Sequence, residues 1–165
     1  MPTQLAYIGL GSNLASPVEQ VRQALNGLAG LPLSRLVIAS SLYASRPVGP
    51  QDQPDFINAV AALETSLSPL ALLDQLQALE QQHRRRRQRH WGPRTLDLDL
   101  LVYGDQHIET PRLCVPHRQM TQRAFVLAPL AEIAPALLLH HKPLTAWLGQ
   151  ISNPGIQRLA EDAPS

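Results

Sequence analysis

The clearest alternation of apolar and polar side chains in the chain lies between residues 96 and 103. Leucine occupies positions 96, 98 and 100, and the positions between them are Asp97 and Asp99. A period of two predicts a strand that turns its leucines to one face and both carboxylates to the other. Ionised carboxylates are seldom buried without partners, so this strand is where we first expect functional chemistry.

Shorter apolar runs before this strand predict other parts of a sheet. They predict strands over residues 5–10, 33–43 and 56–63. In the third of these strands, Phe56, Asn58 and Val60 share one face. The proline-rich residues 44–55 predict an irregular loop before it.

Two helices are predicted between these strands. The first begins with a capping box of Ser16 and Glu19, has Pro17 at its first helical position, and ends before Gly30. The second begins at Pro69 and ends in a run of arginines. We expect its inward face to carry Leu70, Leu73 and Leu76.

The last third of the chain has weaker patterns. Gly104 and Asp105 predict a tight turn that leads into a short hairpin arm over residues 106–108. Prolines predict extended chain and loop over 109–118, and the polar residues 152–165 predict a weakly ordered tail. Helices are expected over 120–127, 129–133 and 144–148, with a turn or short hairpin at 140–142.

The order strand, helix, strand, strand, helix, strand predicts an α+β fold. We expect a ferredoxin-like βαββαβ core with a mostly antiparallel sheet flanked by helices, followed by a C-terminal extension. The length of 165 residues predicts a single domain over 1–165, with its core over roughly 5–150.

Composition narrows the classes of function. The net charge of +1 gives no support to general binding of nucleic acid, because the positive charge is concentrated in residues 84–94. The single cysteine, Cys114, excludes an intrachain disulfide framework and fits a reducing compartment. With no signal sequence and no apolar run of about 18 residues, we expect a cytoplasmic, soluble protein without a membrane span. We also expect a monomer.

The aspartate pair and the nearby arginines indicate an anionic ligand bound together with a cation. Along a strand, Asp97 and Asp99 would lie about 6.6–6.8 Å apart, and their mutual repulsion favours a cation beside them, with Mg²⁺ as the first candidate. Arginines at positions 84–87 and 89 place positive charge next to this pair. A metal ion on one side of the ligand and guanidinium groups on the other suggest that the ligand is a polyphosphate. Taken alone, however, an arginine run is more often a solvated helix end.

Residues 90–101, which read His-Trp-Gly-Pro-Arg-Thr-Leu-Asp-Leu-Asp-Leu-Leu, resemble the signature of the 6-hydroxymethyl-7,8-dihydropterin pyrophosphokinases. The resemblance covers roughly residues 5–135, because 7–14, 47–58 and 115–117 with Arg123 and Phe125 also resemble motifs of that family in the same order. It implies transfer of the β,γ-diphosphate of ATP to the hydroxymethyl group of the pterin, with release of AMP, in folate biosynthesis.

The same resemblance implies roles for individual residues. Asp97 and Asp99 would hold two Mg²⁺ ions that bridge the phosphates. Arg85, Arg87 and Arg94 would also bind the phosphates. Which of the four arginines at 84–87 fill the two phosphate-binding roles stays open. The implied ATP positions are Leu73, Gln77, Glu80, Trp91, Leu100, Arg112, Cys114, His117, Arg118 and Arg123. The implied pterin positions are Ser45, Pro47, Val48, Phe56, Asn58 and Phe125.

Two other classes of protein share parts of this pattern. A nucleotidyltransferase also combines Gly-Ser with Asp-x-Asp, but there the two motifs lie close together, whereas Ser12 and Asp97 are far apart in this chain. An RNA-binding module could share the order of elements and the arginines, but it needs exposed aromatic side chains, and aromatic residues make up only 4% of the chain. The pyrophosphokinase is therefore our principal hypothesis.

Overall fold

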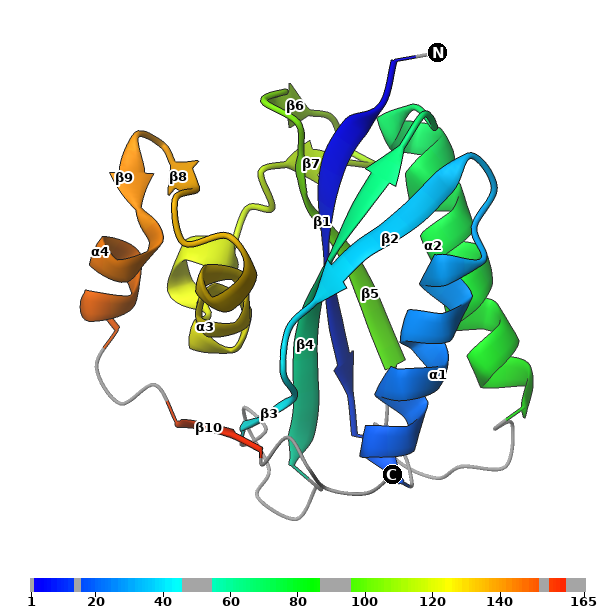
Figure 1. Cartoon of the computed structure of the whole chain (residues 1–165), viewed down its shortest axis with the longest axis horizontal. Coiled ribbons are helices and arrows are strands. Elements are labelled where there is room, and N and C mark those ends of the chain that lie inside the picture. Colours follow the sequence, from blue (N-terminus) through cyan, green and yellow to red (C-terminus); the bar gives the residue numbers. More distant parts are fainter. Residues whose placement is uncertain (1, 14–15, 46–54, 87–95, 152–154, 160–165) are drawn as a thin grey trace.

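The computed structural model describes residues 2–13, 16–45, 55–86, 96–151 and 155–159. A central sheet separates two groups of helices (Figure 1). The strands of this sheet are β1 (Gln4–Ser12), β2 (Ser34–Ala39), β3 (Tyr43–Ser45), β4 (Phe56–Thr65), β5 (Leu96–Tyr103) and β10 (Ile156–Arg158).

The sheet has the order β10-β3-β4-β1-β5, and β2 also pairs with β4. Every neighbouring pair runs antiparallel. The α+β fold with an antiparallel sheet and flanking helices is therefore confirmed. The aspartate-bearing strand β5 lies at one edge, beside β1, which brings the N-terminal strand next to both carboxylates.

One face of the sheet is covered by α1 (Pro17–Ala29) and α2 (Pro69–Arg86), drawn on the right of Figure 1. The apolar period of each helix turns a stripe of side chains onto the sheet, where burial removes them from water. This side of the core includes Ile8, Val21, Leu28, Leu63, Leu76 and Leu98.

The opposite face is covered by α3 (Ala124–Ile133) and α4 (Leu144–Gly149). The core on this side includes Val60, Leu101, Leu127, Leu130 and Leu144. The short strands β8 (Leu138–Leu139) and β9 (Lys142–Pro143) and the 3₁₀ turn η1 (Met120–Gln122) complete this half of the fold. The strands β6 (Ile108–Glu109) and β7 (Cys114–Val115) add Ile108 and Val115 to the core on the side of α1 and α2. The hairpin expected at 140–142 is the confirmed β8–β9 pair.

Several local predictions were wrong at the start of the chain. Ser16 has a left-handed backbone with φ 56°, so its hydroxyl does not cap α1, and its carbonyl accepts a hydrogen bond from the Gln20 amide instead. The strand expected over 33–43 is divided into β2 and β3, because the Ser40 hydroxyl accepts the amide hydrogen of Val60 and replaces a regular rung. In α2 the exposed Leu70 was expected inside, and Leu72 is buried in its place.

Predictions also failed in the last third, where pairing depends on distant partners. The arm expected to return along β5 is β6, which pairs with β7. Pro129 lies inside α3 without ending it, because the fixed φ of proline is compatible with a helix and only one amide hydrogen bond is lost. The polar tail contains β10, which pairs with β3. Among the described residues, no helix has the length and apolar character needed to cross a membrane.

Candidate active site

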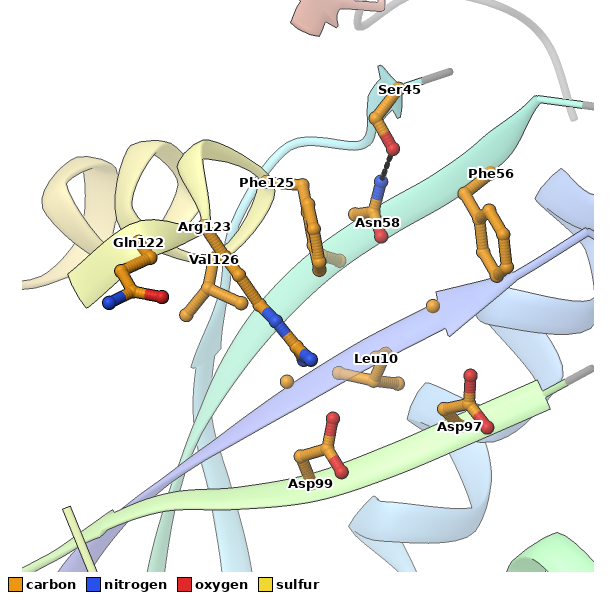
Figure 2. A pocket seen from close by; sticks show the side chains of 13 residues that line it. Leu10, Ser45, Phe56, Asn58, Asp97, Asp99, Gln122, Arg123, Phe125 and Val126 are labelled. Atoms are coloured by element: carbon orange, nitrogen blue, oxygen red, sulfur yellow. Dashed lines mark hydrogen bonds between the residues drawn. The ribbon is translucent and has the colours of Figure 1, made fainter. Parts of the chain in front are cut away.

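The two aspartates of β5 share one face of the strand, as the alternation predicts. Leu96, Leu98 and Leu100 are buried on the face that meets α1 and α2, while Asp97 and Asp99 are half-buried on the other. Figure 2 shows both carboxylates pointing to the same side of the sheet, toward the space below the start of α3. The strand therefore places two acidic side chains at the floor of the cavity described next.

A first cavity of about 460 Å³ lies between α3 and the strands β1, β4 and β5. Phe56 and Phe125 stand on either side of Asn58, and the guanidinium of Arg123 reaches toward Asp99 (Figure 2). The Arg123 guanidinium carbon lies 5.5 Å from the centre of the Phe125 ring. Apolar walls with a few converging polar groups are typical of a site for a flat, polar small molecule.

Asn58 is the best-fixed polar group of this cavity. Its side chain is buried, with 3% of its surface exposed, and its amide nitrogen donates a 2.7 Å hydrogen bond to the Ser45 hydroxyl. With its nitrogen at Ser45, the Asn58 amide has its oxygen toward β1. A pre-set donor and acceptor can read the edge of a heterocycle.

Gly11 on β1 leaves room for the Asn58 amide. A Cβ atom at this position would lie 3.1 Å from the Asn58 Oδ1 atom, closer than ordinary van der Waals contact. Gly9 precedes it by two residues, so both glycines remove side chains from the face of β1 that lines the cavity. This period-two pair of glycines is a signal in the sequence that we missed.

Replacing Gly11 by alanine is expected to weaken binding of the ligand of this cavity about tenfold, because Asn58 must move by a few tenths of an ångström. Nucleotide affinity is expected to stay at the wild-type value. Titration calorimetry with each ligand checks both. Gly149→Ala is the matched control, since nothing lies within 4 Å of a Cβ atom there. Equal losses for both ligands would contradict a local effect.

A second cavity of about 490 Å³ lies on the other side of Asp99. Six of the residues predicted for a nucleotide line it, namely Leu73, Leu100, Arg112, Cys114, His117 and Arg118. Asp99 lines both cavities, so its carboxylate stands where they meet. Arg123, predicted for the nucleotide, lines the first cavity instead, close to that meeting point.

Two other predicted nucleotide residues lie beside this second cavity rather than in its wall. Gln77 accepts a 3.2 Å hydrogen bond from Arg112, whose guanidinium also pairs with Asp74. Glu80 accepts a 2.8 Å hydrogen bond from the backbone amide of Leu98. Because β5 is an edge strand, Glu80 satisfies an amide that has no neighbouring strand.

Burial and the neighbouring charges act on the pKa of Asp99 in opposite directions. Burial raises the pKa of Asp99 above its ordinary value and Asp97 adds to the rise, while His117 and Arg123 act against it. Burial lowers the pKa of His117, and its Nδ1 atom accepts a 3.2 Å hydrogen bond from the Gln119 amide. A neutral His117 ring therefore carries its proton on Nε2. The site holds partly desolvated negative charge that a cation would stabilise.

The oxygen atoms of Asp97 and Asp99 suit Mg²⁺, which commonly binds proteins through one or two carboxylates and takes its other ligands from water and phosphate. Within the described ranges no group of three or more His, Cys, Asp or Glu side chains could hold a metal.

Other predicted site residues fall outside the described residues. These are Pro47, Val48, Arg87, Trp91 and Arg94, while Arg85 belongs to α2 but its side chain is not described. Of the pterin positions, Ser45, Phe56, Asn58 and Phe125 come together in the first cavity. Gln122 and Val126 also line it and were not predicted, because they become neighbours of β4 only through the packing of α3.

Residues 7–135 match the family of 7,8-dihydro-6-hydroxymethylpterin-pyrophosphokinase (HPPK). The 2-amino-4-hydroxy-6-hydroxymethyldihydropteridine pyrophosphokinase of Pseudomonas aeruginosa is 54% identical over 157 residues, which are 94% of this chain and 97% of the relative. The protein of the same name from Haemophilus influenzae is 56% identical over 143 residues, which are 87% of this chain and 89% of the relative.

Solved structures show the same fold at much lower identity. The crystal structure of Plasmodium falciparum HPPK-DHPS with pteroate has a TM-score of 0.72 and 14% identity, over 90% of this chain and 42% of that chain. An HPPK-DHPS in complex with substrates has a TM-score of 0.74 and 13% identity, over 96% of this chain and 47% of that chain. This chain spans less than half of each. By its match over residues 7–135 and its identity to these relatives, the chain belongs to the HPPK family.

Proposed function

We propose that this chain carries out the reaction of its family through the two cavities that meet at Asp99. It transfers the diphosphate of ATP to the hydroxymethyl group of 6-hydroxymethyl-7,8-dihydropterin, giving the pterin diphosphate and AMP, a step of tetrahydrofolate biosynthesis. The observation that carries this proposal is that Asp99 lines both cavities. A phosphate chain in one cavity and an alcohol in the other would meet at a carboxylate suited to a metal.

The first cavity is the proposed pterin site. A flat ring gains stacking from the aromatic side chains of Phe56 and Phe125, and Asn58 offers a donor and an acceptor to its edge. Ser45 holds the Asn58 amide in place. Pro47 and Val48, which follow β3 in the sequence, are proposed to contact the same ring.

The second cavity is the proposed nucleotide site. Leu73 and Leu100 supply apolar surface for the base, while Arg112 and Arg118 supply positive charge. Cys114, Gln77, Glu80 and Trp91 complete the proposed contacts. The neutral His117 ring can donate from Nε2 to a phosphate or ribose oxygen, since its Nδ1 atom already accepts the Gln119 amide hydrogen.

In the reaction, the hydroxymethyl oxygen loses its proton to solvent and forms a bond to the β-phosphorus, while the bond from that phosphorus to the α,β-bridging oxygen breaks and AMP leaves with that oxygen. Two Mg²⁺ ions held by Asp97 and Asp99 would neutralise charge on the transferring group. Arg85, Arg87, Arg94 and Arg123 are proposed to bind the phosphate oxygens. The chain thus contributes alignment and charge, on which phosphoryl transfer mainly depends.

The raised pKa of Asp99 predicts a pH effect on metal binding. Mg²⁺ binds the ionised carboxylate, so binding in the presence of nucleotide must release a proton whenever Asp99 is protonated beforehand. We expect the affinity to fall and the proton release to grow as the pH decreases toward that pKa. Calorimetry in two buffers of different ionisation enthalpy measures the release, and a release unchanged in Asp99→Asn would contradict this assignment.

Nucleotide products test the proposed reaction. The protein is incubated with Mg-ATP, with and without 6-hydroxymethyl-7,8-dihydropterin, and the nucleotides are separated by chromatography. We expect AMP to form only when pterin is present. ADP would indicate transfer of a single phosphoryl group, and free diphosphate would indicate a nucleotidyltransferase; either product, or no turnover, would overturn the proposal.

A further inference from the structure

Glu132, near the end of α3, receives hydrogen bonds from two segments that are distant in sequence. Its carboxylate accepts the Ser41 backbone amide at 3.0 and 3.1 Å and the Ser41 hydroxyl at 2.9 Å. The Tyr43 hydroxyl donates to it at 2.8 Å, and Arg158 lies 3.4 Å away. A single carboxylate thus joins α3 to the chain that enters β3 and to β10.

These partners lie in or beside β3, the strand that pairs with β4 at Asn58. Tyr43 begins β3, and Ser45, which ends it, accepts the hydrogen bond that orients Asn58. On its other edge β3 pairs with β10, where Ile156 faces Ser45 and Arg158 faces Tyr43. Glu132 therefore contacts both strands of the β3–β10 pair, and β3 in turn accepts the hydrogen bond from Asn58 through Ser45.

The same helix carries the opposite wall of the cavity. Phe125 and Glu132 are seven residues apart in α3, so they lie on one helix face about 10.5 Å apart along the axis. Pro129 lies between them and removes the amide that would bond to the Phe125 carbonyl. Apolar side chains of α3 already pack on β4, and Glu132 adds a polar contact from the same helix to the chain around β3.

We propose that Glu132 is a positioning residue for the pterin site, whose carboxylate fixes β3 and β10 against α3 and so holds Asn58 at a set distance from Phe125. The inference rests on the proposed function for the identity of the ligand. Glu132 itself touches neither cavity lining nor phosphate, so it acts through Tyr43 and Ser45. Its loss should weaken pterin binding and leave nucleotide binding unchanged.

The test uses Glu132→Gln in the full chain, with Glu64→Gln as its matched control. Glu64 on β4 is also an ion-paired glutamate, 3.3 Å from Arg35, but its partner lies on β2 rather than at the cavity. Binding of 6-hydroxymethylpterin is followed by its fluorescence, with a non-hydrolysable Mg-ATP analogue present. We expect Glu132→Gln to raise the pterin Kd about tenfold, the lower end of the loss found when a residue that orients a metal ligand is replaced. Glu64→Gln should leave it unchanged.

A second measurement reports the Glu132 contact itself. Burial, followed by the hydrogen bond and charge of Glu132, raises the pKa of Tyr43 to about 12. Carbon-13 NMR of the tyrosine ring, with circular dichroism as a check on folding, should show this ionisation moving to lower pH in Glu132→Gln. It should stay above the ordinary value of 10.0, since burial remains.

Two results would overturn the inference. One is a shifted Tyr43 ionisation with an unchanged pterin Kd, and the other is an equal loss of pterin and nucleotide affinity, which indicates a general structural role. Should Glu132→Gln fail to fold, Tyr43→Phe is tested in its place, because it removes only one hydroxyl. This variant must raise the pterin Kd and leave the nucleotide Kd unchanged. A wild-type protein that binds pterin but forms no AMP would refute the proposed function and leave this test intact.

Discussion

Replacing Asp99 by asparagine is expected to lower the turnover number about 10³-fold, because the change removes the carboxylate at the meeting point of the two cavities. The side chain keeps its shape, so both ligands should still enter. Steady-state kinetics with the chromatographic AMP assay measures the loss. A variant that kept near-full turnover would show that Asp99 does not hold the metal.

The same substitution is expected to stabilise the unliganded protein at neutral pH. Burial and Asp97 raise the pKa of Asp99 in the folded protein above its value in the unfolded chain. Below the unfolded-state pKa the carboxyl is protonated in both states, and the stability of the fold is fully present. This stability is lost as the pH rises through the folded-state pKa, because the carboxylate is then charged inside the fold. The wild type therefore carries an unfavourable buried charge at pH 7 that the Asp99→Asn variant would lack. Urea unfolding should show nearly equal stability at low pH and a gain for Asp99→Asn at pH 7.

Asp105→Asn provides the control for both effects. Asp105 is exposed in the turn after β5, close in sequence but outside the lining of either cavity. It should neither lower turnover nor stabilise the protein at pH 7. If Asp99→Asn proved less stable than the wild type at pH 7, the burial and repulsion assigned to Asp99 would be wrong.

Replacing Asn58 by alanine is expected to weaken pterin binding about 10²-fold, since a buried edge of the pterin would lose its donor and acceptor together. Nucleotide affinity should not change, because Asn58 lines only the first of the two cavities. Pterin fluorescence and nucleotide calorimetry measure the two constants separately.

Two further variants sharpen the result. Asn26→Ala, on an exposed position of α1, is the matched control and should bind both ligands normally. Ser45→Ala keeps Asn58 but releases its amide, so it should cause a smaller loss, about tenfold. An unchanged pterin Kd in Asn58→Ala would place the pterin elsewhere.

Features that depend on side-chain period were predictable from the sequence. The shared face of Asp97 and Asp99 and that of Phe56 and Asn58 follow from the geometry of a strand, whatever it pairs with. The order of elements likewise led to the antiparallel sheet with flanking helices. The family resemblance then connected these faces with a pterin and a nucleotide.

Features that depend on distant partners were not predictable. The polar residues of β10 carry no period, and their strand exists because β3 offers a free edge to pair with. The capping box at Ser16 failed because the backbone there is left-handed, which the sequence does not reveal. Glu132 resembles any solvated helix residue until packing brings Ser41 and Tyr43 to it.

The most direct test of Asp99 as the meeting point of the two sites is a paramagnetic relaxation measurement. Mn²⁺ replaces Mg²⁺ in a complex with a non-hydrolysable ATP analogue and carbon-13-labelled 6-hydroxymethylpterin. The hydroxymethyl carbon is expected to relax fastest of all pterin carbons in the wild type, and to lose that enhancement in Asp99→Asn. Fastest relaxation at the amino edge of the ring, or an enhancement that survives in Asp99→Asn, would contradict the placement of metal and pterin around this carboxylate.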